Sequence, residues 1–226
     1  MAPPQKWIRS SAAQAVSPPQ GSTRSRTWLA LTGAVAVVLV IAGFWILLRY
    51  SESPGQSGSA LARWPADAPV ALELDRPTLL LFAHPQCPCT RATVGELDRI
   101  AARCRDRVRV IAFFLSEPDL GESWTHSALW SQAAAIPSVD VRADVHGAIA
   151  RRFGVSTSGH VLLYAADGRL LFEGGITDSR GHAGDNAGED SVVKAILEGA
   201  TGSSSTRVYG CSLDSQCQAP SDGGAP

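Results

Sequence analysis

The feature that most constrains this chain is an apolar run near its N-terminus that contains no charged residue. It extends from Trp28 to Leu48 and reads WLALTGAVAVVLVIAGFWILL, with an aromatic residue near each end. Because an α-helix rises about 1.5 Å per residue, roughly 20 such residues cross a hydrocarbon core about 30 Å thick. A core helix of a soluble protein would carry a polar face, and the apolar part of a cleavable signal peptide is usually about 7 to 15 residues long. The sequence therefore predicts a single, uncleaved transmembrane anchor over residues 28–48.

Charges on either side of this run predict its orientation. Four basic residues and no acidic residue precede it, whereas the flank that follows is mixed, with Arg49, Glu52 and Arg63. By the positive-inside rule, the N-terminus stays in the cytoplasm and everything after Tyr50 is exported. In a bacterium this predicts a single-pass inner-membrane protein whose C-terminal domain faces the periplasm, where disulfides can persist. Cysteines of the exported part therefore become candidates for redox or structural roles.

Composition divides the remaining chain into a folded domain and three polar segments. Residues 1–27 are expected to form a disordered cytoplasmic tail, and residues 49–61 are expected to form a flexible linker, because both segments lack an apolar period. The folded domain is expected over residues 62–200, and residues 201–226 form a polar tail that contains Cys211 and Cys217. A net charge of -1 gives no basic surface, so nucleic acid is not expected as a partner.

Apolar patterns inside the domain predict alternating strands and helices. Between strands expected over residues 78–83 and 107–116, Leu97, Ile100, Ala101 and Cys104 recur at helical spacing. The turn signal Asp167-Gly168 predicts an antiparallel hairpin over residues 160–175. Further elements are a helix over 123–136, a strand over 138–145, a helical turn over 146–155 and a last amphipathic helix containing Val192, Val193, Ile196 and Leu197. This order predicts an α/β fold, a central mixed sheet flanked by helices.

Two cysteines one residue apart, Cys87 and Cys89 in HPQCPCTRA, follow the first apolar strand. If a helix starts there, Cys87 lies at or beside its N-cap and Pro88 at its first position. The helix N-terminus would then lower the pKa of Cys87 and make it a nucleophile, with Cys89 resolving. A disulfide across one intervening residue is strained and easily reduced, so we expect an oxidising couple. The alternative is an inert structural disulfide.

Three histidines and three further cysteines are secondary candidates. His160 and His84 can assist proton transfer or ligate a metal, or can be hydrogen-bonded structural residues, and His182 lies in a Gly-rich loop that can approach the pair. Cys104 belongs to an apolar helical face, which predicts a buried, inert thiol. For the tail, three possibilities stay open: a small Cys211–Cys217 disulfide, a Cys211 that folds back as a third thiol, or no function.

The element order, with a cysteine pair after the first strand, resembles the thioredoxin fold, more narrowly the membrane-tethered exported proteins of the TlpA and peroxiredoxin-related type. Stretches HPQCPCTRA, TSGHVLLY, GGITDSRGHAGDNAG and VYGC are similar to RedB-type proteins. Two features depart from the thioredoxin pattern. The pair is C-P-C instead of C-x-x-C, and Gly159 stands where the resemblance implies a cis-proline. The residues that match the family's run before that loop are Asp144, Gly147, Ala150, Phe153, Gly154 and Val155.

The resemblance implies a membrane-anchored, periplasm-facing thiol-disulfide oxidoreductase with Cys87, Cys89 and His160 as site residues. It implies no cofactor and no bound metal, and its partners would be exported protein thiols or disulfides, or a membrane electron donor. The alternative is a copper(I)-binding, metallochaperone-like protein that uses the same cysteines and His160, since soft thiolates suit copper(I). It is similar to Sco-type proteins, whose C-x-x-x-C spacing differs. A peroxidase is less favoured, since no T-x-x-C motif precedes the pair. A non-catalytic partner-binding domain is the remaining alternative.

Overall fold

The computed structural model describes residues 23–56, 58–199, 202 and 204–213, and the chain divides into one unit up to Leu48 and another from Arg49 onward. Helix α1 (Thr23–Ser51) contains the predicted anchor. Its part from Thr27 to Ser51 is long and apolar enough to cross a membrane. Of the cytoplasmic tail predicted over residues 1–27, residues 1–22 lie outside the described residues.

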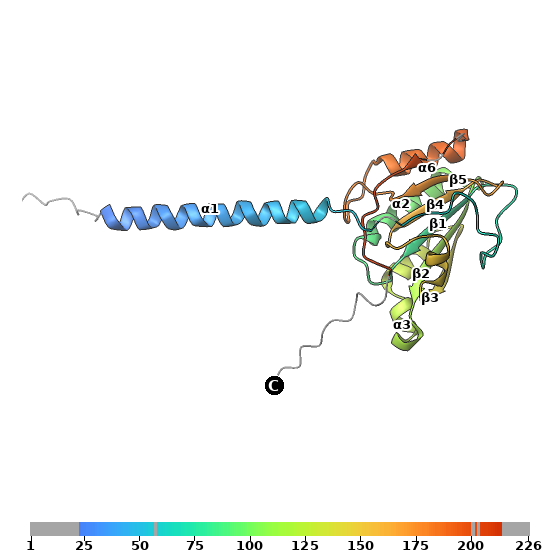
Figure 1. The fold of residues 1–226 in the computed structure, drawn as a ribbon, viewed down its shortest axis with the longest axis horizontal. Coiled ribbons are helices and arrows are strands. Elements are labelled where there is room, and N and C mark those ends of the chain that lie inside the picture. The colour runs from blue at the N-terminus through green and yellow to red at the C-terminus, as the bar shows by residue number, and fades with distance from the viewer. Residues whose placement is uncertain (1–22, 57, 200–201, 203, 214–226) are drawn as a thin grey trace, which may run out of the picture. The chain divides into compact units, whose positions relative to one another are not determined.

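The second unit is built on a six-stranded mixed sheet with the order β3-β2-β1-β4-β5-β6 (Figure 1). Central strand β1 pairs in parallel with β2 and antiparallel with β4. The hairpin predicted around Asp167-Gly168 is present as antiparallel β4 and β5. The strands are β1 (Thr78–Ala83), β2 (Arg109–Ser116), β3 (Val139–Val145), β4 (His160–Tyr164), β5 (Leu170–Gly174) and β6 (Ser204–Ser205).

Helices cover both faces of this sheet and enclose two apolar clusters. Residues Leu79, Leu81 and Ala83 of β1 face the first cluster, into which α2, α4 and α6 insert apolar side chains. Leu80 and Phe82 face the second cluster, which α5 and the segment before β1 close. The predicted α/β class with a mixed sheet flanked by helices is therefore confirmed. The helices are α2 (Thr90–Arg103), η1 (Pro118–Leu120), α3 (Glu122–Thr125), α4 (Ala128–Ala134), α5 (Ala148–Arg152) and α6 (Ala187–Glu198).

The helix predicted over residues 123–136 is instead two short helices, α3 and α4, separated at His126 and Ser127. The Ser127 backbone is extended, and its hydroxyl accepts a hydrogen bond from the Trp130 N–H at the start of α4. Serine is a favoured N-cap because its oxygen satisfies an amide that has no helical partner. A local cap therefore breaks a segment whose apolar spacing alone suggests one helix.

Parts of the predicted linker and of the polar tail lie against the domain. The Gly55 N–H donates to the Val208 carbonyl oxygen at 2.8 Å, and the Thr157 hydroxyl donates to the Gln56 carbonyl oxygen at 2.7 Å. Strand β6, which lies in the predicted tail, pairs with β5. The residues that build the folded unit thus extend beyond 62–200 on both sides, and Cys217 lies outside the described residues.

Candidate active site

The cysteine pair lies in the connection between β1 and α2. The Cys87 N–H donates to the His84 carbonyl oxygen at 3.1 Å, which closes a turn before the helix begins. Helix α2 starts at Thr90 with Cys89 at its N-cap. We predicted Cys87 at or beside the N-cap and Pro88 as the first helical residue, and the structure places both before the cap. The turn at His84 delays the helix, so Cys87 lies two residues before the cap.

Cys87 carries the strongest electrostatic perturbation of the pair. A hydrogen bond from the Cys211 side chain is the main cause that lowers the pKa of Cys87 to about 4. Burial opposes this shift, and the hydroxyl and N–H of Thr90 add to it. The Thr90 N–H belongs to the first turn of α2, so the helix amide that we predicted does contribute. Thiolate is the nucleophilic form of cysteine, so these interactions favour the form in which Cys87 can attack another sulfur.

The two neighbouring thiols hold their protons. Burial, followed by the negative charge of Cys87, raises the pKa of Cys89, and the Arg180 guanidinium acts in the opposite direction. The hydrogen bond to Cys87, together with burial, raises the pKa of Cys211 far above the ordinary value. The three shifts therefore favour ionisation of Cys87 over ionisation of Cys89 and Cys211.

A loop before β4 fixes the cysteine turn from the other side. The Ser158 hydroxyl accepts a hydrogen bond from the His84 N–H at 2.7 Å and lies 2.6 Å from the Thr90 hydroxyl. The Gly159 N–H donates to the Phe82 carbonyl oxygen at 2.7 Å, and Gly159 has a φ of 87°. This backbone conformation favours glycine. Gly159, where the resemblance implies a proline, therefore has a backbone conformation that proline cannot adopt.

His160 is buried on one face of the sheet. It pairs with Phe82 across β1 and β4, so the two side chains share the face of the second apolar cluster, whereas α2 packs on the other face. Burial lowers the pKa of His160 to about 4. Neither ring nitrogen has a hydrogen-bond partner among the residues that the structure describes. Among the described residues, no interaction of this ring with Cys87 or Cys89 is found. Its burial and its lowered pKa are those of a neutral core histidine.

The other predicted histidines and Cys104 differ in their burial and in their contacts. His84 is buried, its Nδ1 accepts a hydrogen bond from the Gln86 N–H at 3.1 Å, and its ring meets that of Trp124 edge-on. His182 is exposed, with its N–H donating to the Ser179 carbonyl oxygen. Cys104 is fully buried in the first apolar cluster, as its position on the apolar helical face predicts.

Three residues of the site were not singled out by sequence reasoning: Thr90, Ser158 and Arg180. The Arg180 guanidinium donates to the Gly210 carbonyl oxygen at 2.9 Å and to the Ser53 carbonyl oxygen at 3.2 Å. Adjacency was the only sequence signal for the first two, since Thr90 follows the cysteine pair and Ser158 precedes Gly159. Arg180 lies in the Gly-rich loop that we associated with His182, and the loop reaches the site through the arginine.

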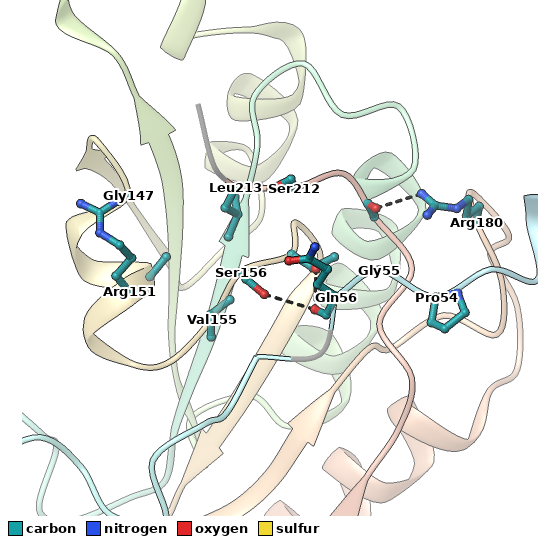
Figure 2. A pocket seen from close by; sticks show the side chains of 13 residues that line it. Pro54, Gly55, Gln56, Gly147, Arg151, Val155, Ser156, Arg180, Ser212 and Leu213 are labelled. Atoms are coloured by element: carbon teal, nitrogen blue, oxygen red, sulfur yellow. Dashed lines mark hydrogen bonds between the residues drawn. The ribbon is translucent and has the colours of Figure 1, made fainter. Parts of the chain in front are cut away.

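A cavity of about 570 Å³ lies beside the site (Figure 2). The Ser156 hydroxyl donates to the Gln56 carbonyl oxygen at 3.2 Å across it. In the described residues, no group of three or more His, Cys, Asp or Glu side chains is arranged to hold a metal ion. The cavity is lined by Pro54, Gly55, Gln56, Gly147, Ala150, Arg151, Val155, Ser156, Thr157, Arg180, Gly210, Ser212 and Leu213.

No protein-family model and no curated protein sequence matches the chain. Among solved structures, an uncharacterized conserved protein from Geobacillus kaustophilus is similar at 18% identity and a TM-score of 0.52, over 75% of this chain and 94% of that one. The fold is thioredoxin-like in its own topology, in which a β1-α2-β2 unit and a later β4-β5 hairpin with a last helix share one mixed sheet. Two more distant structures are a secreted Mycobacterium tuberculosis disulfide oxidoreductase homologous to E. coli DsbE (20% identity, TM-score 0.40, 56% of this chain and 84% of that one) and a putative thiol:disulfide interchange protein DsbE from Chlorobium tepidum (18%, 0.43, 63% and 99%). At these identities the likeness concerns the fold alone.

Proposed function

We propose that this chain is a membrane-anchored thiol-disulfide oxidoreductase whose thioredoxin-like domain faces the periplasm and acts through the C-P-C cysteines. The observation that carries the proposal is the position of Cys87, which is buried in the turn between β1 and α2 beside Cys211 and Thr90. These two neighbours lower its pKa and so favour the thiolate. A buried structural cysteine has no need of such a stabilised charge, because burial alone raises the pKa of a thiol.

The reaction follows from the charge distribution. The Cys87 thiolate attacks one sulfur of a partner disulfide, so that a mixed disulfide forms and the partner's other sulfur leaves as a thiolate. A second thiol of the site then attacks the Cys87 sulfur and releases the partner's first sulfur, which takes up the proton that the attacking thiol gives up. The partner gains two electrons and the site loses two, and the same steps run in reverse for oxidation.

Orientation and partners follow from the anchor. Four basic residues before the apolar run that starts at Trp28 favour a cytoplasmic N-terminus, which exports the cysteine pair to the oxidising side of a bacterial inner membrane. Exported protein thiols or disulfides, or a membrane electron donor, would then be the partners. The finer resemblance to RedB-type and TlpA-type proteins rests on the sequence stretches alone and agrees with this location.

The copper(I) alternative has no specific support in the site. It would use His160 together with the two cysteines, and the pairing of His160 with Phe82 puts the histidine side chain on the sheet face opposite α2. We therefore retain the redox proposal alone.

Exchange with oxidised glutathione tests the proposal directly. The full chain in detergent is reduced, mixed with oxidised glutathione, and its thiols are counted with time by blocking and mass spectrometry. We expect two thiols of the site to be lost, Cys87→Ser to abolish the loss, and the matched variant Cys104→Ala, in the apolar core, to keep it. Equal loss in Cys87→Ser would contradict the assignment of the nucleophile.

A further inference from the structure

The C-terminal tail is paired with the loop that precedes β4. The Ser158 N–H donates to the Cys211 carbonyl oxygen at 2.8 Å, and the Leu213 N–H donates to the Ser156 carbonyl oxygen at 2.8 Å. Thr157 and Ser212 form an antiparallel bridge between these bonds. The tail thus adds a short antiparallel segment to the same loop whose Ser158 hydroxyl holds the cysteine turn.

Several independent contacts hold this segment in place. Val208, Tyr209 and Leu213 are buried, and the Val208 carbonyl oxygen accepts the hydrogen bond from Gly55. Arg180 donates to the Gly210 carbonyl oxygen from the Gly-rich loop. The backbone at Gly210 approaches the Ser158 carbonyl oxygen so closely that a Cβ there would collide with it. Glycine at this position therefore permits the tail to lie flat against the loop.

The docked tail places Cys211 beside the cysteine turn, because the loop that pairs with Cys211 also holds that turn through the Ser158 hydroxyl. Cys87 is only 3% exposed, and the neighbouring Cys211 side chain favours its thiolate form. An external disulfide cannot reach so buried a sulfur while the tail is in place. Cys211, in contrast, is held against that sulfur by the backbone pairing of its own segment, so it is the thiol that meets Cys87 whenever the tail is docked.

We propose that Cys211 is the resolving thiol of this site, so that the oxidised protein carries a Cys87–Cys211 disulfide that ties the tail to the loop. The proposal rests on the proposed function. With the tail displaced, the Cys87 thiolate attacks the partner disulfide, and the mixed disulfide forms as the partner's other sulfur leaves. When the tail returns, the Cys211 sulfur attacks the Cys87 sulfur, the partner's first sulfur leaves, and it takes the proton that Cys211 gives up.

Cys89 is less suited to this step. A disulfide between Cys87 and Cys89 would span the single residue Pro88, and so short a loop forces the bond away from preferred geometry. The φ of Pro88 is fixed by its ring, which leaves less freedom to relieve that strain. Cys211 approaches from a separate segment and has no such restriction.

The experiment uses full-length chain in detergent with Cys104→Ala and Cys217→Ser, so that Cys87, Cys89 and Cys211 remain. Reduced protein is oxidised with oxidised glutathione, quenched with acid, blocked with N-ethylmaleimide and digested with trypsin. Trypsin leaves Cys87 and Cys89 on one peptide, residues 64–91, and Cys211 on another, residues 208–226. We expect a disulfide that joins the two peptides, and we expect it to persist in Cys89→Ser. In Cys211→Ser, the fraction of Cys87 that carries glutathione should be about 10-fold or more higher than in the parent protein. Cys211→Ala should show the same increase.

The outcomes separate this inference from the proposed function. A Cys87–Cys89 disulfide within one peptide, with no extra glutathione on Cys87 in Cys211→Ser, would overturn the inference and leave the oxidoreductase intact. Absence of any glutathione adduct in the double variant Cys89→Ser, Cys211→Ser, where nothing can resolve it, would overturn the proposed function itself. Circular dichroism of each variant confirms that the fold is kept.

Discussion

Gly210→Ala is the perturbation that most sharply separates the tail from the cysteine pair. The φ of Gly210 is not in the left-handed region, so the backbone conformation itself suits alanine. The added Cβ, however, would lie less than 3.0 Å from the Ser158 carbonyl oxygen, which is closer than Cβ atoms approach other atoms. The tail must then move away from the loop. A shift of about 1 Å breaks the bond from Ser158 to Cys211, because hydrogen bonds of this kind rarely exceed about 3.2 Å.

The expected magnitude follows from the hydrogen bond that Cys87 loses. A hydrogen bond to a charged group contributes about 1.5 to 3 kcal/mol. At about 1.36 kcal/mol per unit, its loss raises the pKa of Cys87 by about 1 to 2 units. Starting from a pKa of about 4, the midpoint should rise to about 5 to 6. The alkylation rate above that midpoint should also increase, because the tail no longer covers the sulfur.

The assay is the pH dependence of Cys87 alkylation by iodoacetamide, measured by mass spectrometry on the full chain in detergent. Gly202→Ala is the matched control, since no described atom lies within 4 Å of the Cβ it adds to the same tail. It should keep both the midpoint and the rate of the unmodified protein. An unchanged midpoint in Gly210→Ala would refute the argument that the docked tail stabilises the thiolate.

Three further predictions concern the loop, the buried histidine and the topology. Gly159→Pro should lower the free energy of unfolding by about 3 kcal/mol or more, because proline cannot adopt a φ of 87° and removes the N–H donor to Phe82; unfolding by urea that matches the unmodified chain would refute this. The pKa of His160 is about 4 in the folded chain, against an ordinary value of 6.5, so the unfolded chain binds its proton first as the pH falls. Stability from this group is present above pH 6.5 and is lost toward pH 4, by about 3 kcal/mol. His160→Leu should flatten the pH dependence of urea unfolding in that window, and an equally steep dependence would contradict a buried neutral ring. Finally, an alkaline phosphatase fused after Pro226 should be active, whereas an active cytoplasmic reporter at that position would reverse the orientation.

Local patterns predicted much of the sheet. The run TLLLFA predicts a strand over residues 78–83, and β1 has these bounds, because a six-residue apolar run that follows a proline is too short for a typical buried helix and fits a buried strand. The hairpin followed from Asp167-Gly168 in the same way, since the turn and the two apolar runs are neighbours in the chain. Such elements depend on interactions within a few residues, which the sequence displays directly.

The tail illustrates what local patterns cannot predict. Residues 204–213 are mostly polar or small, with Val208, Tyr209 and Leu213 as the large apolar exceptions, yet they pair with β5 and with the loop at Ser158. These are contacts between distant segments, and a single sequence does not record them. For the same reason, the sequence predicts the lowered pKa of Cys87 but not its main cause. Helix amides were expected to dominate, whereas the Cys211 side chain contributes most.

The reduction potential of the full chain tests the central claim, a reactive Cys87 thiolate that exchanges with disulfides. Stabilising a thiolate favours the reduced form, and at pH 7 a thiol with a pKa of about 4 is ionised more completely than the thioredoxin nucleophile at about 7. This difference shifts the potential by about 80 mV, from the roughly -270 mV of thioredoxin to about -190 mV. The protein is equilibrated in glutathione buffers of known potential, its free thiols are blocked, and the reduced fraction is measured by mass spectrometry. This fraction should show a reversible two-electron couple near that value, and the couple should be absent in Cys87→Ser. A couple at or below -270 mV, or one that survives in Cys87→Ser, would contradict the account.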